Sequence, residues 1–124
     1  MNAKDPKLVA LEFNDCITRQ DLVGLARLMT EGHAFIDREG IVHQPRKFMI
    51  ESWKEFFVMY PAYRNTLTRV ESRDNVVAML GHAYWSENQA YDPAIWTATI
   101  VDDKVSEWRI YADTPENRRR FRLA

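Results

Sequence analysis

The chain has 124 residues, enough for one domain with a buried core and too few for two ordinary domains, so we expect a single domain over residues 1–124. Hydrophobic residues make up 46% and charged residues 28%, as is usual for a soluble globular protein. The 17 basic and 18 acidic side chains nearly balance, which leaves no global field to attract nucleic acid or an anionic membrane.

The single cysteine, Cys16, excludes an internal disulfide and a metal site built from several cysteines. No apolar run approaches the roughly 18–20 residues that span a membrane. The first residues also lack the basic and apolar pattern of a signal peptide. We therefore expect a soluble, cytoplasmic protein with no membrane partner.

Two helices are expected at the start of the chain. Asp5 and Pro6 are typical of a helix N-cap and first turn. Asp21 is predicted to cap a second, short helix, which we expect Gly32 to end. Apolar side chains recur on one face of each helix: Val9, Phe13, Cys16 and Ile17 in the first, and Leu22, Leu25, Ala26 and Met29 in the second.

The next stretch predicts a β-hairpin. Residues 33–37 alternate as a strand does, a glycine marks the turn, and residues 41–44 form a short second strand. Side chains two apart in a strand share a face, so His33, Phe35 and Asp37 should point the same way. This pattern is typical of the wall of a reactive pocket, and equally of an ordinary strand whose histidine has its hydrogen bonds satisfied within the protein.

Residues 45–60 predict the clearest helix, which begins at Pro45 and ends before Pro61. Its apolar face is nearly all large or aromatic: Met49, Trp53, Phe56, Phe57 and Tyr60. Four tryptophans, five tyrosines and six phenylalanines in the whole chain are an unusually rich set. Such rings bury large areas, and they also line cavities and subunit interfaces.

After Pro61 the pattern changes to a period of two. Strands are expected over 63–72, 76–86, 94–101 and 105–112, joined by turns at 73–75 and 102–104 and by a loop at 87–93. Thr114 and Pro115 predict the cap of a last helical turn, which carries Arg118, Arg119, Arg120 and Arg122. Helices come first and an antiparallel meander follows, so the order α-α-β-β-α-β-β-β-β predicts an α+β fold.

The long strands are apolar on both faces. One face of the second long strand carries Val76, Ala78, Leu80 and Tyr84, and the other carries Val77, Met79, Ala83 and Trp85. Three helices can cover only one face of such a sheet, and monomers seldom expose a large apolar face. We therefore expect a homodimer that forms through the back of the sheet.

Several local patterns accompany this element order. They are the helix junction at Gln20 and Asp21, the hairpin His33-Ala-Phe-Ile-Asp37 with Gly40, the set Met49, Trp53, Phe57, Pro61 and Tyr63, and the segment Glu107-Trp-Arg-Ile-Tyr-Ala-Asp113. Residues 8–112 thereby resemble the nuclear transport factor 2-like superfamily, and within it the SnoaL-like group. The resemblance implies a curved antiparallel (mixed) sheet wrapped around a long helix, forming a cone with an internal pocket, usually in a dimer. The superfamily includes ketosteroid isomerases, polyketide cyclases, epoxide hydrolases, dehydratases and non-catalytic proteins, and fold alone does not choose among them.

The resemblance places Asp37 near the general base of the isomerases. A carboxylate in an apolar, aromatic cavity would have a raised pKa and could move a proton. The alternative is a turn aspartate that accepts backbone N–H groups ahead of Gly40. His33 is a candidate acid, base or hydrogen-bond donor, or else a half-buried strand histidine. Four residues along a strand span roughly 13 Å, so His33 and Asp37 are not expected to form a simple dyad.

Asp113 is the third candidate catalytic residue, because the resemblance implies an acid at the end of the last strand in cyclase-like relatives. A capping role beside Thr114 is the alternative. Ligand contacts are expected from seven aromatic residues: Phe13, Trp53, Phe57, Tyr63, Trp96, Trp108 and Tyr111. Core packing is the alternative for them. His82 lies on a face that is either the pocket or the dimer interface.

Two departures from the family argue against steroid isomerisation. Isomerases of this fold hold the developing oxyanion with a tyrosine on the first helix and a carboxyl group on a late strand. Here the tyrosine position holds Phe13, and residues 95–99 contain no carboxylate. An oxyanion hole contributes several kcal/mol to such a transition state, so isomerisation of steroids is not expected.

Other chemistries have no motif in this chain. Phosphate loops, dinucleotide fingerprints and hydrolase elbows are missing, and three dispersed histidines predict no metal or cofactor. The arginines at 118–122 are interpreted as a solvated tail. We expect a small apolar organic ligand and acid–base chemistry centred on Asp37. The alternative is a non-catalytic binding or accessory domain, which a cavity below about 100 Å³ would favour, against roughly 300 Å³ for ordinary ligand sites.

Overall fold

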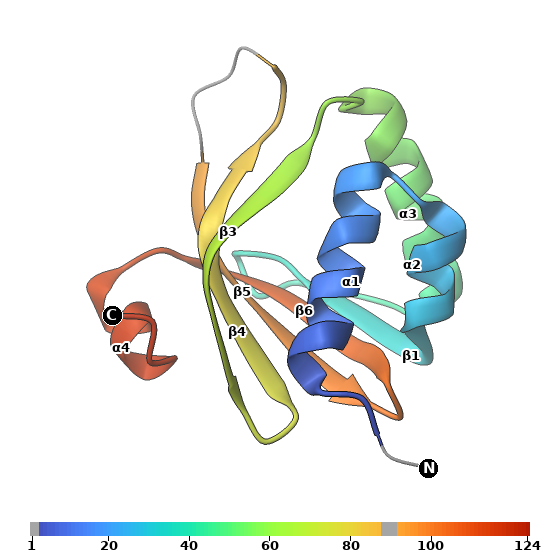
Figure 1. Ribbon diagram of the computed structural model, residues 1–124. Helices are drawn as coiled ribbons and strands as arrows, with labels where there is room; N and C mark the ends of the chain where they lie inside the picture. The colour runs from blue at the N-terminus through green and yellow to red at the C-terminus, as the bar shows by residue number, and fades with distance from the viewer. Residues whose placement is uncertain (1–2, 88–91) are drawn as a thin grey trace.

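The structure is a computed structural model that describes residues 3–87 and 92–124. Its elements in chain order are α1 (Pro6–Arg19), α2 (Leu22–Leu28), β1 (Met29–Ile36), β2 (Val42–His43), α3 (Arg46–Met59), β3 (Arg64–Arg73), β4 (Val76–Tyr84), β5 (Asp92–Val101), β6 (Lys104–Ala112) and α4 (Pro115–Arg120). Helices α1, α2 and α3 lie on one side of a curved sheet, and α4 lies on the other side (Figure 1). The predicted α+β class is confirmed.

The local helix signals operate as predicted. The side chain of Asp5 accepts a hydrogen bond from the Lys7 N–H, and Pro6 occupies the first turn of α1. Asp21 caps α2 by accepting from the Gly24 N–H at 2.9 Å. Helix α3 follows Pro45 and ends at Met59, and no helix in the described residues is long and apolar enough to cross a membrane.

The predicted end of α2 at Gly32 is wrong. The helix ends at Leu28, and Met29 is already extended. Met29 is fully buried and pairs with Val105 of β6, so β1 begins four residues earlier than the predicted strand. Pairing with a distant strand therefore determines this boundary, and Gly32 lies within β1 rather than at a helix cap.

The six strands form one mixed sheet in the order β2-β1-β6-β5-β4-β3. Strands β3 to β6 form the predicted antiparallel meander, whereas β1 pairs with β6 in parallel. In β3 the register shifts between Leu67 and Arg69, which leaves Thr68 as the extra residue of a bulge. Bulges bend a strand and increase its twist, which suits a sheet that curves around helices.

Two loop boundaries differ from the sequence prediction. Strand β4 ends at Tyr84 rather than at residue 86, and β5 starts at Asp92 rather than at residue 94. Asp92 pairs with Ala83, so the added residues at the start of β5 continue the ladder with β4. Residues 88–91 of the predicted 87–93 loop lie outside the described residues.

The concave face and the back face of the sheet have separate cores. Trp96 and Trp108 are buried on the concave face in the main cluster, together with residues of α1 and α3. On the back face Leu80 and Ile95 are buried with Leu123, which follows α4. The chain's own C-terminal residues therefore cover part of the face for which we expected a second subunit, and dimerisation stays a prediction.

Candidate functional site

A cavity of about 450 Å³ lies against the concave face of the sheet. Eight phenylalanine, tyrosine and tryptophan rings line it: Phe35, Phe48, Trp53, Phe56, Tyr63, Trp85, Trp96 and Trp108. Polar side chains also line it, among them Asp37, Arg38, Glu39, His43, Asn65 and Asp92. The volume exceeds the roughly 300 Å³ at which ordinary ligand sites begin. Aromatic side chains therefore do not close this space.

Strand register explains why the wall residues meet. Trp108 pairs with Ala98 on one side and with Phe35 on the other, and Phe35 pairs with His43. Directly paired residues share a face of the sheet, so these side chains form one row across four strands. Helix α3 faces this row through Trp53, whose ring centroid lies 6.2 Å from that of Phe35.

Asp37 and His43 form a hydrogen-bonded pair at the cavity. The Asp37 Oδ2 and the His43 Nε2 are 3.0 Å apart, and both residues line the cavity. The other carboxylate oxygen, Oδ1, accepts from the backbone N–H groups of Glu39 and Ile41, each at 3.0 Å. Asp37 therefore accepts the backbone N–H groups of its turn, as the alternative interpretation proposed. It also has a side-chain partner, His43, that the sequence did not lead us to expect.

The expected rise in the pKa of Asp37 is wrong. The hydrogen bond from His43 and, next, the Ile41 N–H hold the pKa of this carboxyl below its ordinary value. Asp37 is therefore ionised at neutral pH and can only accept hydrogen bonds. The Nε2 of His43 must then be the donor, since a carboxylate only accepts. In the tautomer that carries its one proton on Nε2, the Nδ1 lone pair is available as a base.

His33 lies in the core and is not among the cavity residues. It is 0% exposed, and its Nδ1 donates to the Val105 carbonyl at 2.6 Å. Burial lowers the pKa of His33 below its ordinary value, so the ring is neutral. Its ring packs 5.6 Å from that of Phe13 on α1, on the same side of the sheet as the cavity. The structure brings His43, and not His33, to Asp37.

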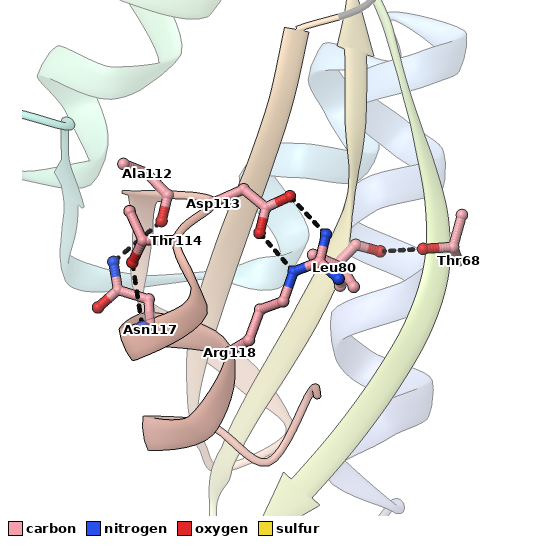
Figure 2. A network of polar contacts seen from close by, with 7 residues as sticks. All are labelled: Thr68, Leu80, Ala112, Asp113, Thr114, Asn117 and Arg118. Carbon is pink, nitrogen blue, oxygen red and sulfur yellow. Dashed lines mark hydrogen bonds and ion pairs between the residues drawn. The ribbon is translucent and has the colours of Figure 1, made fainter.

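Asp113 and Tyr111 lie on the back face of the sheet, away from the cavity. Arg118 donates to both Asp113 oxygens, at 2.6 and 2.8 Å (Figure 2), and this pairing holds the pKa of Asp113 below its ordinary value. Tyr111 packs against Phe121, with 4.9 Å between the ring centroids. His82 lines a second hollow on this face together with Asp113. His82 therefore lies on the back face and not at the cavity.

The predicted ligand contacts divide into wall and core. Trp53, Tyr63, Trp96 and Trp108 line the cavity, whereas Phe13 and Phe57 stand one layer behind them. The Phe13 ring lies 4.8 Å from that of Trp108, and the Phe57 ring lies 5.5 Å from that of Trp53. Both phenylalanines therefore support the wall.

Arg38 and Asp92 join two edges of the cavity. The Arg38 Nη2 lies 3.1 Å from the Asp92 Oδ2 and donates to the Pro93 carbonyl at 3.2 Å. The Trp85 indole N–H donates to the same Asp92 oxygen at 3.3 Å. Burial, and next the negative charge of Asp92, raise the pKa of Tyr63, so its hydroxyl stays protonated.

Two buried polar atoms of cavity residues have no hydrogen-bond partner in the described part of the chain. They are the Nε1 of Trp53, a donor, and the Oδ1 of Asn65, an acceptor. The Nδ2 of Asn65 donates to the Asn14 Oδ1 at 3.1 Å, which orients the amide. Both atoms are shielded from solvent, and an unsatisfied buried polar atom costs free energy, so each would gain from a partner that a side-chain movement brought within reach.

No group of three or more His, Cys, Asp or Glu side chains among residues 3–87 and 92–124 is arranged to hold a metal ion. The cavity itself is lined by acids, bases and hydrogen-bond donors. Asp37, His43, Tyr63 and Trp53 supply these groups.

The helix order and the curved mixed sheet are those of the nuclear transport factor 2-like fold, as the resemblance predicted. Among solved structures, a putative SnoaL-like polyketide cyclase from Shewanella putrefaciens has a TM-score of 0.76 at 14% identity, covering 90% of this chain and 82% of that one. An NTF2-like protein of unknown function from Cytophaga hutchinsonii has a TM-score of 0.74 at 12% identity, covering 91% and 95%.

An LEH-like epoxide hydrolase from M. tuberculosis has a TM-score of 0.77 at 8% identity, covering 87% of this chain and 82% of that one. No family model matches the sequence, and no curated protein resembles it closely enough to match. Identities this low show a shared fold and leave the reaction to be argued from the site.

Proposed function

We propose that the protein binds a small, mostly apolar organic molecule in the cavity and transfers a proton on it, with His43 as the base and Asp37 as its orienting carboxylate. The observation that carries this proposal is the 3.0 Å contact between His43 and Asp37 at a cavity of about 450 Å³. Imidazole is the side chain best suited to proton transfer near neutral pH.

In this mechanism the Nδ1 of His43 takes a proton from the bound molecule. The imidazolium that forms is stabilised by the ionised Asp37, which keeps the ring in one orientation. The same proton then returns to another atom of the ligand or to water. A positioned general base of this kind typically contributes about 10²–10⁴-fold in rate.

Removal of a proton leaves negative charge on the ligand, and two donors line the same cavity. The Tyr63 hydroxyl stays protonated. The Trp53 Nε1 is a buried donor with no partner among the described residues, and it would reach the ligand through a rotation of its ring. They would take the place of the tyrosine and carboxyl group of the steroid isomerases, whose positions here hold Phe13 and no acid. Such donors stabilise an oxyanion when water is excluded.

Hydrogen–deuterium exchange on 2-tetralone tests this proposal without knowledge of the natural substrate. Its carbon acid lies beside a carbonyl on a small apolar body. We expect NMR to show exchange in D₂O faster than in buffer alone, and faster than with His43→Gln, by at least about tenfold. Asp37→Asn should also slow exchange, because the Nε2 of His43 loses its ionised acceptor.

His82→Gln is the matched control, since His82 lies on the back face. Exchange that persists unchanged in His43→Gln, or that disappears in His82→Gln, would contradict the assignment. Binding of 2-tetralone with no exchange above buffer would favour the alternative function, a non-catalytic ligand-binding domain.

A further inference from the structure

The charged side chains of the cavity are mostly acidic, although the whole chain is nearly neutral. Three carboxylates line it, those of Asp37, Glu39 and Asp92, against the single guanidinium of Arg38. The full sequence has 17 basic and 18 acidic residues, so this excess is local. A local excess of one sign inside a concave, low-dielectric surface concentrates the field there.

The guanidinium of Arg38 is already paired within the protein. Arg38 contacts Asp92 at 3.1 Å and donates to the Pro93 carbonyl at 3.2 Å. His43 contacts Asp37 at 3.0 Å, and even a positive charge on its ring would leave three carboxylates against two cations. Asp37 and Glu39 therefore leave the cavity with a net negative charge, which opposes an anionic ligand.

An unpartnered acceptor lies on the same wall. Asn65 pairs with Ala83, and Ala83 pairs with Asp92, so the three residues form a row across β3, β4 and β5. Asn65 is 7% exposed, and its Oδ1 has no hydrogen-bond partner within residues 3–87 and 92–124. The Oδ1 is shielded from solvent, so it adds negative potential to this wall and would accept from a ligand N–H or O–H group once the amide rotates.

The remaining wall suits a cation attached to an apolar body. Aromatic rings such as those of Trp53, Trp85 and Tyr63 line the cavity. Ring faces attract ammonium groups, most strongly when water is excluded. The acidic charge, the unpartnered acceptor and the aromatic walls thus all favour a cationic ligand with an apolar body.

We propose that the cavity selects small organic cations, namely amines whose ammonium group lies near Asp37, Glu39 and Asp92 and whose apolar body packs among the rings. This inference rests on the proposed function, since it names the class of ligand for the same cavity. It excludes carboxylates and other anions as preferred ligands.

Three tetralins with the same bicyclic body provide the test. They are 2-aminotetralin, a cation at neutral pH, 2-tetralol, which is neutral, and tetralin-2-carboxylate, an anion. Isothermal titration calorimetry should show that the amine binds about tenfold more tightly than the alcohol, the size of a favourable cation–π contact. The carboxylate should bind most weakly. Raising the salt from about 0.01 M to about 1 M shortens the screening length from about 30 Å to about 3 Å and should shrink these differences.

A charge variant tests whether the carboxylate of Glu39 contributes to the preference for cations. Glu39→Gln should lower the ratio of amine to carboxylate affinity about threefold, a modest share of the screened attraction at an exposed rim. Glu55→Gln, on the exposed side of α3, removes the same charge away from the cavity and should leave the ratio unchanged.

The possible failures are distinguishable. If tetralin-2-carboxylate binds as tightly as 2-aminotetralin, or if Glu39→Gln leaves the ratio unchanged, selection of cations is refuted and the proposed function stands. If none of the three compounds binds, and 2-tetralone does not bind either, the ligand-binding function itself fails and this inference fails with it.

Discussion

Leu123 offers a sharp test of the energetic role of the C-terminal residues on the back face. It is 2% exposed and is buried with Ala78, Leu80 and Ile95. Replacement of a buried leucine by alanine costs about 2–5 kcal/mol, and the lower end applies where a site near a chain end can relax. We therefore expect Leu123→Ala to lower the free energy of unfolding by about 2–3 kcal/mol.

For a chain of 124 residues, an unfolding entropy of about 2.1 cal/mol/K per residue converts this loss into a fall in Tm of about 8–12 °C. Differential scanning calorimetry measures the fall. Leu8→Ala is the matched control, because Leu8 is 55% exposed on α1 and should change Tm by no more than about 2 °C. Equal Tm values for Leu123→Ala and the control would refute the stabilising role of this segment.

Two further predictions concern the core and the β3–β4 bulge. Because burial lowers the pKa of His33 below 6.5, the unfolded chain takes up this proton first, so the contribution of His33 is complete above about pH 6.5 and is lost as the pH falls toward the folded pKa. Urea midpoints between pH 8 and pH 5 should fall less steeply in His33→Phe than in the wild type, and equal slopes would contradict the assignment. Gly81→Ala should destabilise the protein by about 1–3 kcal/mol, because a Cβ there overlaps the Thr66 carbonyl. Gly32→Ala, where a Cβ meets nothing within 4 Å, should cost far less in the same denaturation assay.

Features that depend on neighbours in sequence were predictable. The caps at Asp5, Asp21 and Thr114 follow from side chains that reach their own helix N–H groups, and the structure has all three. The alternation in β4 also predicted which residues share a face, since Val77 and Met79 join the main core and Leu80 joins the back-face core. Short-range geometry determines both features.

Features that depend on distant strands were not predictable in the same way. The start of β1 at Met29 requires β6, and the placement of Asp92 on the cavity wall requires β4. His43 was within reach of sequence reasoning, because a hairpin that turns after Asp37 pairs Phe35 with His43 on the same face. The direction of the pKa shift of Asp37 could not be inferred without this partner, since burial and hydrogen bonding shift a carboxyl pKa in opposite directions.

The residues after α4 lacked any pattern that predicts burial. Four arginines surround Phe121 and Leu123, which is typical of a solvated tail, yet both apolar side chains pack on the back face. Arg120 lies over the rings of Tyr111 and Phe121, at 5.5 and 5.0 Å from their centroids. Arginine side chains therefore cover apolar surface here as well as carrying charge.

The parallel pairing of β1 with β6 also has a consequence for the order in which the protein folds. The bond from His33 to Val105 joins residues 72 positions apart, and Phe35 meets Trp108 through the same pair of strands. Closing so long a loop costs entropy before any contact compensates for it, so such pairings tend to form late. The helices and the β3–β5 meander can assemble from nearer contacts, but the row that joins Trp108 to Phe35 and His43 cannot. The cavity wall is thus expected to be among the last parts of the molecule to form and, under stress, among the first to be lost.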